Sequence, residues 1–97
     1  MRQDIITLQN LINSGMAWTL EGSIGRTCMA ALENGDVMLG TEIKYDFYGN
    51  HIPARTMVQP GTKGSRQLVV DTHGEEYAAE LELVPDTFMI ENFLSNC

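Results

Sequence analysis

The sequence has few of the features that mark an enzyme, a membrane protein or a secreted protein. Its 97 residues include two Cys, two His and no Cys-x-x-Cys pair, so neither a disulfide framework nor a metal site is expected. No pair of carboxylates and no Ser-His-Asp order with a nucleophile elbow stands out. No apolar run approaches the roughly 18 residues of a membrane span, and the N-terminus lacks the basic and apolar blocks of a secretory signal. These absences predict one small cytosolic domain, residues 1–97, that is not an enzyme and holds no cofactor or metal.

Basic residues are also scarce, and the charge is distributed unevenly. The chain has six Lys and Arg against 13 Asp and Glu, a net charge of −7, and residues 71–97 contain seven acids and no Lys or Arg. Duplex-binding surfaces carry clustered Lys and Arg, so nucleic acid is not expected as the main partner. The acidic C-terminal third either keeps that end solvated or faces a basic surface of another protein. The candidate protein-binding residues there are Glu80, Glu82 and Glu91.

The first third of the chain predicts two helices. Apolar side chains recur at helical spacing over residues 4–14, and Gly15 is placed to end that helix. A second apolar stripe predicts a helix within residues 16–34. Its start has two alternatives, because Ser14 can cap a long helix and Ser23 can cap a shorter one.

The rest of the chain favours short strands. Residues 37–39 and 43–48 are apolar or β-prone runs, and residues 49–65 are rich in turn-forming Gly and Pro. Residues 67–71 and 76–84 predict a C-terminal hairpin, because apolar and polar side chains alternate along the second segment.

Pro85 ends the predicted hairpin, and Asp86 is placed to cap a final short helix. The predicted fold is therefore an α+β domain with two N-terminal helices, a small antiparallel sheet that includes the C-terminal hairpin, and a short final helix. The side chains expected to anchor that helix are Phe88, Met89, Phe93 and Leu94.

Two Gly-rich segments and the residues between them offer groups that hold an anion. Residues 22–26 (GSIGR) combine glycines at a helix start with a cation, and residues 60–65 (PGTKGS) form a second flexible loop. The residues around Gly49 add an aromatic ring, an amide, an imidazole and a guanidinium. The alternatives are helix packing, an ordinary turn and a polar loop network. The candidate ligand-binding residues are Ser23, Arg26, Tyr48, Asn50, His51, Arg55, Thr62 and Lys63.

Cys28 and Trp18 both fall within the second predicted helix. Free Cys is among the most buried residue types, so Cys28 is expected to be a core residue rather than a reactive thiol. Trp18 is either a core residue or an anchor for a partner, and its size favours the core.

Three sequence blocks in a fixed order are recognisable. They are residues 16–26 (MAWTLEGSIGR), 46–56 (DFYGNHIPART) and 60–65 (PGTKGS). Together they resemble a family of short accessory proteins encoded by tailed bacteriophages. The resemblance covers residues 10–66 and not the acidic end. It implies no activity, but it implies a phage protein that acts inside the host bacterial cytoplasm.

This context gives three hypotheses for function. The first is a non-catalytic inhibitor that binds a host protein, such as a bacterial defence component, with help from its acidic end. The second is a small-molecule binding protein that sequesters a nucleotide-like anion, and the third is a homo-oligomeric structural protein. Convergence of Arg26, Arg55 and Lys63 on one pocket would favour the nucleotide-like ligand, whereas dispersed side chains would favour a protein partner.

Overall fold

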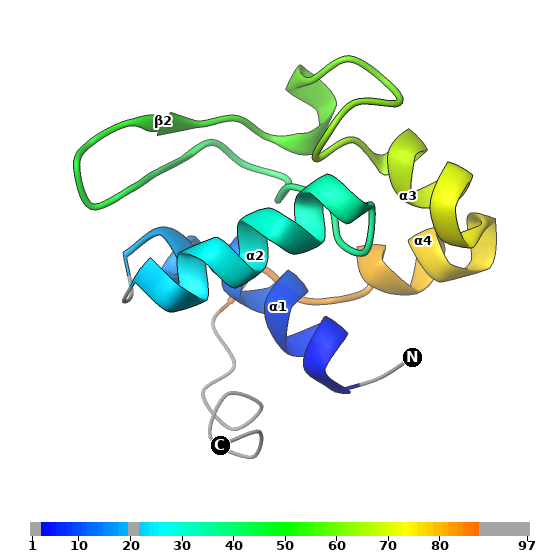
Figure 1. Cartoon of the computed structure of the whole chain (residues 1–97), viewed down its shortest axis with the longest axis horizontal. Coiled ribbons are helices and arrows are strands. Elements are labelled where there is room, and N and C mark those ends of the chain that lie inside the picture. The colour runs from blue at the N-terminus through cyan, green and yellow to red at the C-terminus, as the bar shows by residue number, and fades with distance from the viewer. Residues whose placement is uncertain (1–2, 20–21, 88–97) are drawn as a thin grey trace.

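The computed structural model describes residues 3–19 and 22–87 (Figure 1). In these ranges the chain is mostly helical and carries one two-stranded antiparallel sheet. None of the described helices is long and apolar enough to cross a membrane. The elements in chain order are α1 (Gln3–Ser14), the 3-10 helix η1 (Met16–Trp18), α2 (Gly22–Asn34), β1 (Lys44–Tyr45), β2 (His51–Ile52), the 3-10 helix η2 (Arg55–Met57), α3 (Arg66–His73) and α4 (Glu75–Glu82).

The two ends of the molecule are built from different elements. Figure 1 shows the β1–β2 turn and the start of α2 at one end, and the α3–α4 pair at the other. The core lies between them. The β1–β2 turn therefore lies far from the helices α3 and α4, which carry acidic side chains (Figure 1).

The N-terminal helices follow the prediction in part. The first predicted helix is confirmed as α1, and Gly15 follows it with a φ of +83°, a left-handed conformation that Gly adopts without strain. The long alternative for the second helix is wrong, because the chain separates into η1 and an α2 that starts at Gly22. The two pieces pack closely, since a Cβ on Gly25 would lie 3.4 Å from the carbonyl oxygen of Ala17.

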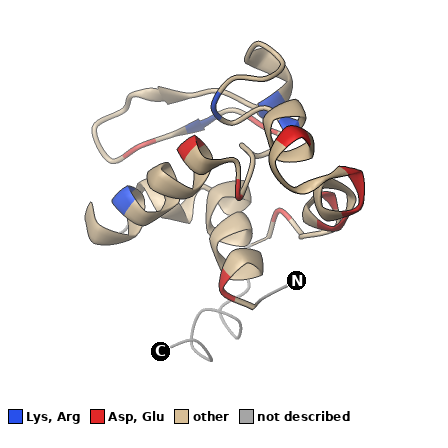
Figure 2. Cartoon of the chain, turned by 45° about the vertical axis from the view of Figure 1, so that its right-hand side comes forward, with Lys and Arg blue, Asp and Glu red and all other residues tan. Residues whose placement is uncertain are grey.

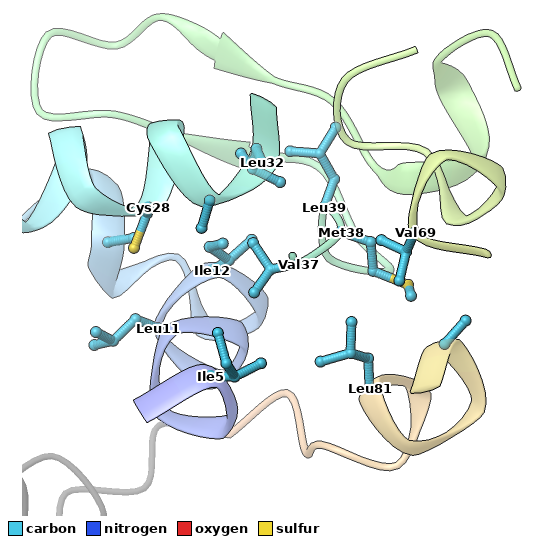
Figure 3. Packing of buried hydrophobic residues seen from close by; sticks show 13 residues of the cluster. Ile5, Leu11, Ile12, Cys28, Leu32, Val37, Met38, Leu39, Val69 and Leu81 are labelled. Carbon is cyan, nitrogen blue, oxygen red and sulfur yellow. The ribbon is translucent and has the colours of Figure 1, made fainter. Parts of the chain in front are cut away.

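The core gathers apolar side chains from α1, α2, the segment after α2 and the α3–α4 pair (Figure 3). Burying a large aliphatic side chain contributes roughly 1.5–3 kcal/mol relative to leaving it exposed. The predicted core role of Cys28 is confirmed, and burial raises the pKa of its thiol to about 12. The buried apolar side chains of this cluster include Ile5, Leu11, Ile12, Leu32, Val37, Met38, Leu39, Val69 and Leu81.

The predicted strand at residues 37–39 is wrong, although the segment is buried. Its backbone pairs with the side chains of Gln9 and Arg55, and the Leu39 N–H donates to the Gly64 carbonyl (3.0 Å) in a loop. The amide N–H of Met38 donates to Oε1 of Gln9 (2.9 Å), and Nε2 of Gln9 donates to the Met38 carbonyl (2.8 Å). The Leu39 carbonyl accepts from Nε of Arg55 (2.7 Å). Buried backbone groups are therefore satisfied without a β-ladder.

The sheet is also shorter than predicted. The strand expected over residues 43–48 is confined to Lys44 and Tyr45, and β2 falls in the stretch expected to be loop. Lys44 pairs with Ile52 and Tyr45 pairs with His51. The strand stops at Tyr45 because the next residue begins a tight turn.

The predicted C-terminal hairpin is wrong, because its two segments fall in the helices α3 and α4. Alternation placed Ala79 and Leu83 on the buried face of a strand, but both side chains are exposed. The buried residues of α4 are Ala78 and Leu81, which are three positions apart and share one face of a helix. The chain therefore remains in the α+β class with fewer strands and more helix than expected.

Local signals explain why this region is helical. Ser65 caps α3, because its hydroxyl oxygen accepts from the backbone N–H of Leu68 (3.1 Å). Gly74 separates the two helices at a φ of +99°. The rings of His73 and Tyr77 stack across this joint with centroids 4.1 Å apart.

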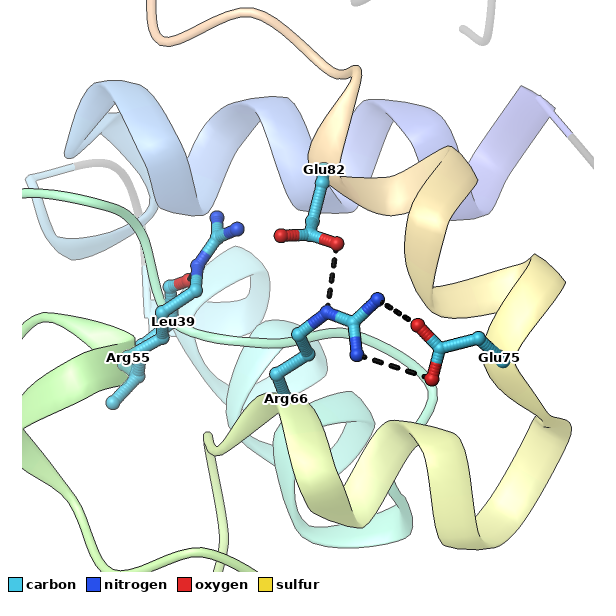
Figure 4. Close-up of polar contacts among 5 residues, drawn as sticks. All are labelled: Leu39, Arg55, Arg66, Glu75 and Glu82. Atoms are coloured by element: carbon cyan, nitrogen blue, oxygen red, sulfur yellow. Dashed lines mark hydrogen bonds and ion pairs between the residues drawn. The ribbon is translucent and has the colours of Figure 1, made fainter.

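Arg66 on α3 holds both ends of α4 (Figure 4). Its Nη1 and Nη2 donate to the two carboxylate oxygens of Glu75, and its Nε donates to Oε1 of Glu82 (2.7 Å). The hydrogen bonds to Glu75 and then Glu82 raise the pKa of Arg66, and the bonds from Arg66 lower the pKa of Glu75. The two helices therefore form one clamped unit.

The predicted final helix lies outside the described residues, as does Glu91. Asp86, the expected cap, is described: its Oδ2 accepts from Oγ1 of Thr41 (3.0 Å). This bond ties the chain after α4 to the segment before β1.

Candidate functional site

A cleft of about 610 Å³ lies between η1, the first half of α2 and the β1–β2 turn. We call it the Trp18 cleft. Most of its lining is apolar, aromatic or glycine, and a binding site of this size usually combines such a lining with a few placed polar groups. Its principal lining residues are Ala17, Trp18, Arg26, Met29, Phe47 and Tyr48.

Asp46 fixes the turn that carries Phe47 and Tyr48. Its Oδ1 accepts from the backbone N–H groups of Tyr48 (2.9 Å) and Asn50 (2.8 Å), and its Oδ2 accepts from Nδ2 of Asn50 (3.1 Å). These bonds, led by the backbone N–H of Asn50, lower the pKa of Asp46. The backbone N–H of Phe47 donates to the Trp18 carbonyl (3.0 Å), which ties the turn to η1. The Asp46 carboxylate therefore builds the turn.

This turn and β1 expose three large aromatic side chains, Tyr45, Phe47 and Tyr48, which we call the aromatic tip. Their exposed fractions are 60%, 77% and 85%. The rings of Phe47 and Tyr48 meet edge to face, with centroids 5.4 Å apart. Aromatic residues that cluster in exposed positions mark interaction sites rather than core.

Trp18 contributes a polar group with no partner. Its indole Nε1 is buried, and no acceptor for it lies in the part of the chain that the structure describes. An unpaired buried donor costs roughly 1–3 kcal/mol. Together with Met29, Trp18 also lines a second cavity of about 190 Å³, so this residue borders both spaces. The core role that the size of Trp18 favoured holds in part, because the half-buried side chain packs against the core cluster and also lines both cavities.

Arg26 is the cation of the Trp18 cleft. It is exposed, and its side chain has no hydrogen bond or ion pair with any residue in the described ranges. A Cβ on Gly22 would lie 3.0 Å from its Nη1, so the guanidinium lies close over the start of α2. The first turn of α2 contains no Asp or Glu that would neutralise it.

The three predicted cations do not meet in one pocket. Arg26 and Tyr48 line the Trp18 cleft, whereas Lys63 lines the smaller cavity. Arg55 is only 9% exposed and bonds to the Leu39 carbonyl, and burial lowers the pKa of its guanidinium. The structure thus brings two predicted ligand residues together and separates the others.

The remaining predicted ligand residues have local contacts. Asn50 belongs to the β1–β2 turn, and His51 packs edge-on against Tyr45 with centroids 6.0 Å apart. The hydroxyl of Thr62 donates to a backbone carbonyl of its own turn, and Ser23 is exposed on α2. Sequence reasoning also missed Phe47 and Met29, although Phe47 stands inside a block that it singled out.

The predicted acidic surface is partly engaged within the chain. Figure 2 shows Asp and Glu on the α4 end of the molecule, away from the β1–β2 turn. Glu80 is exposed on α4, whereas Glu82 pairs with Arg66. One of the two described candidates is therefore part of the α3–α4 clamp.

A His–Asp pair lies outside the cleft. Nε2 of His73 is 2.7 Å from Oδ1 of Asp36, and the hydroxyl of Tyr77 donates to the Asp36 carbonyl (2.7 Å). These contacts tie the α3–α4 joint to the end of α2. Within residues 3–19 and 22–87, no three His, Cys, Asp or Glu side chains are grouped to hold a metal ion.

Comparison with known proteins gives one partial match. A family model described as a domain of unknown function (DUF7417) matches residues 2–47. No curated protein and no solved structure matches the chain. The matched segment includes α1, η1, α2 and β1, and it contains every principal lining residue of the Trp18 cleft except Tyr48. Over the part that builds the cleft, the chain is similar to this family of unknown function.

Proposed function

We propose that this chain is a non-catalytic binding protein that engages a host protein through its aromatic tip and inhibits it. The observation that carries the proposal is the exposure of Phe47 and Tyr48 on a turn that Asp46 holds in place. Aromatic residues supply much of the binding energy of protein interfaces, and a preorganised turn loses little entropy on association. The aromatic tip therefore offers ready-made anchors.

A nucleotide-like ligand has less support, because its expected cations are dispersed. A phosphate group needs several donors directed at one point. Here Arg26 is the one Lys or Arg among the described lining residues of the Trp18 cleft. Nζ of Lys63 lies 3.9 Å from Oε1 of Glu33, and Nε of Arg55 donates to the Leu39 carbonyl. A protein surface, which buries aromatic side chains over a wide area, suits this end of the molecule better.

The proposed setting is the cytoplasm of a host bacterium, with a defence component as the kind of target expected. The resemblance to phage accessory proteins is the support for that setting. The proposed contact surface differs from the acidic end first considered, because Glu82 is engaged by Arg66. A second copy of this chain is the competing occupant of the aromatic tip, and it corresponds to the homo-oligomeric alternative.

The test compares three tagged baits in bacterial lysate: the wild-type chain, Tyr48→Ala and Leu83→Ala. Leu83 is the matched control, because it is 82% exposed but lies at the α4 end. We expect one stoichiometric protein to be retained by the wild type and Leu83→Ala. With the purified target, Tyr48→Ala should weaken binding about 30-fold or more, as for an interface hot spot.

Inhibition is tested by adding increasing amounts of the chain to the purified target and measuring the activity of the target. The loss of activity should be complete at a stoichiometric amount of the chain. Equal retention of the same protein by all three baits would contradict the role of the aromatic tip. Recovery of only a homodimer that Tyr48→Ala dissociates would favour the structural role instead.

A further inference from the structure

Two residues of the Trp18 cleft carry donors that lack acceptors among residues 3–19 and 22–87. The Arg26 guanidinium has no carboxylate partner in these ranges, and the indole N–H of Trp18 is buried there without an acceptor. Donors of this kind bind a carboxylate more strongly than a neutral group. Both donors therefore favour a ligand that carries a carboxylate.

The acid already present in the cleft does not supply that chemistry. Asp46 lies at the edge of the cleft, but both of its carboxylate oxygens accept hydrogen bonds from Tyr48 and Asn50 within the turn. The first turn of α2 contributes no acid either. As far as the described residues go, the Arg26 charge is thus left available to an outside group.

The rest of the cleft suits an apolar neighbour of that carboxylate. Met29, Phe47 and the face of Trp18 line it, and Gly22 and Gly25 present no side chain toward it. Trp18 also lines the cavity of about 190 Å³. Its Nε1 is buried, so the side chain has to move for the N–H to reach a group seated in the larger cleft.

We propose that the Trp18 cleft binds a segment of the protein partner in which an acidic side chain stands next to a large apolar one. Arg26 pairs with the carboxylate, the apolar side chain packs against Met29 and Phe47, and the Trp18 N–H donates to the segment. This inference rests on the proposed function and names the part of the partner that the cleft recognises. Charge complementarity with Arg26 is what selects an acidic segment over a neutral one.

The test uses two synthetic peptides, acetyl-Asp-Phe-amide and acetyl-Asn-Phe-amide, at millimolar concentration. Trp18 is the only tryptophan of the chain, so its fluorescence and its indole N–H resonance come from one side chain, which lines this cleft and the smaller cavity. The Asp peptide should shift the indole resonance and bind about tenfold more tightly than the Asn peptide, and added salt should reduce the difference.

Two variants separate the charge of Arg26 from charge in general. Arg26→Met keeps an unbranched side chain and should abolish the preference for the Asp peptide. Lys63→Met removes a cation from the smaller cavity and should leave the preference unchanged. Both positions are exposed, so thermal unfolding should confirm that each variant folds.

The inference is overturned if neither peptide shifts the Trp18 signals, if both peptides bind equally, or if Arg26→Met retains the preference. These results are independent of the lysate experiment, which depends on Tyr48 and on the host protein. Capture without peptide selectivity would leave the proposed function standing and remove only the acidic-segment inference.

Discussion

Replacing Gln9 by Met should destabilise the fold severely, although the two side chains have similar volume. Gln9 is fully buried, and its amide makes hydrogen bonds with both the N–H and the carbonyl of Met38. Met cannot make these bonds, so two buried backbone groups lose their partners, and Oδ1 of Asn13 also loses the bond that Nε2 of Gln9 donates to it (2.8 Å). Each unsatisfied group costs roughly 1–3 kcal/mol, which gives a loss of about 2–6 kcal/mol in the free energy of unfolding. That is a large part of the roughly 5–15 kcal/mol that stabilises a typical domain.

The measurement is urea unfolding followed by circular dichroism and by the fluorescence of Trp18. With a slope of about 1–3 kcal/mol per molar urea, the midpoint should fall by about 1 M or more. Gln67→Met is the matched control, because Gln67 is exposed on α3 and its side-chain Nε2 donates to Oδ1 of the exposed Asp71 (2.8 Å). It should change stability by no more than about 0.5 kcal/mol.

A loss below about 1 kcal/mol in Gln9→Met would refute the reasoning. It would mean that water or a local shift satisfies Met38 as well as Gln9 does. An equal effect of Gln67→Met would also refute it, since the cost would then come from loss of a Gln side chain in any position.

Three further predictions follow from single positions. Gly64→Ala should lower the free energy of unfolding by about 1–3 kcal/mol, because Gly64 has a φ of +88° and its new Cβ would lie 2.6 Å from the Leu39 side chain. Gly61→Ala, at the same φ but in open space, should lower it by only about 1 kcal/mol, and urea unfolding measures both losses. Burial raises the pKa of the Cys28 thiol to about 12, so Cys28 should resist iodoacetamide at pH 8 until the chain is unfolded. Peptide mass mapping measures this alkylation, and rapid alkylation of the folded protein would contradict the burial of Cys28. The turn that Asp46 builds should be lost at low pH, because the pKa of this carboxylate is lowered on folding: its stabilisation is complete above the unfolded value of 3.8 and disappears as the pH falls through the folded value. The NMR resonance of the Tyr48 backbone amide should shift as the turn is lost, and Asp46→Asn should abolish this pH-dependent shift.

The first helix could be predicted because its signals are local. Helical spacing and a following Gly15 are sufficient to place α1. Residues 37–39 show where such signals stop: an apolar run identifies a buried segment, but nothing in it reveals that Gln9 takes the place of a neighbouring strand. Gln9 is 29 positions away, and its pairing with Met38 exists only in three dimensions.

The C-terminal error has a different cause, since the sequence there supports two patterns. Alternation over residues 76–84 suits a strand, but Ala78 and Leu81 also suit one face of a helix. Ser65 as a helix cap and Gly74 as a break between two helices were the signals that decide for helix. Gly74 suits the turn of a hairpin as well as a break between two helices, so it does not decide between the two patterns by itself.

The sequence predicted the candidate site only in part. Arg26 and Tyr48 were both predicted as ligand-binding residues, and they belong to the two sequence blocks that meet at the Trp18 cleft. Arg55 follows the alternative of a polar loop network, because its guanidinium donates to the Leu39 carbonyl. No pattern within a single chain distinguishes this role of Arg from that of a ligand-binding residue.

The family match separates the two ends of the molecule and makes a last prediction. Residues 2–47 contain the Trp18 cleft apart from Tyr48, whereas α3 and α4, with their acidic side chains, lie beyond it. If the cleft recognises an acidic segment, relatives that share residues 2–47 should keep a cation at position 26 and an aromatic donor at position 18, even where their C-terminal parts differ. Aligning such relatives tests this directly, because a structural role for Arg26 is hard to reconcile with an exposed guanidinium that has no partner among the described residues. Frequent replacement of Arg26 by Asp or Glu would remove the charge on which recognition of an acidic segment depends.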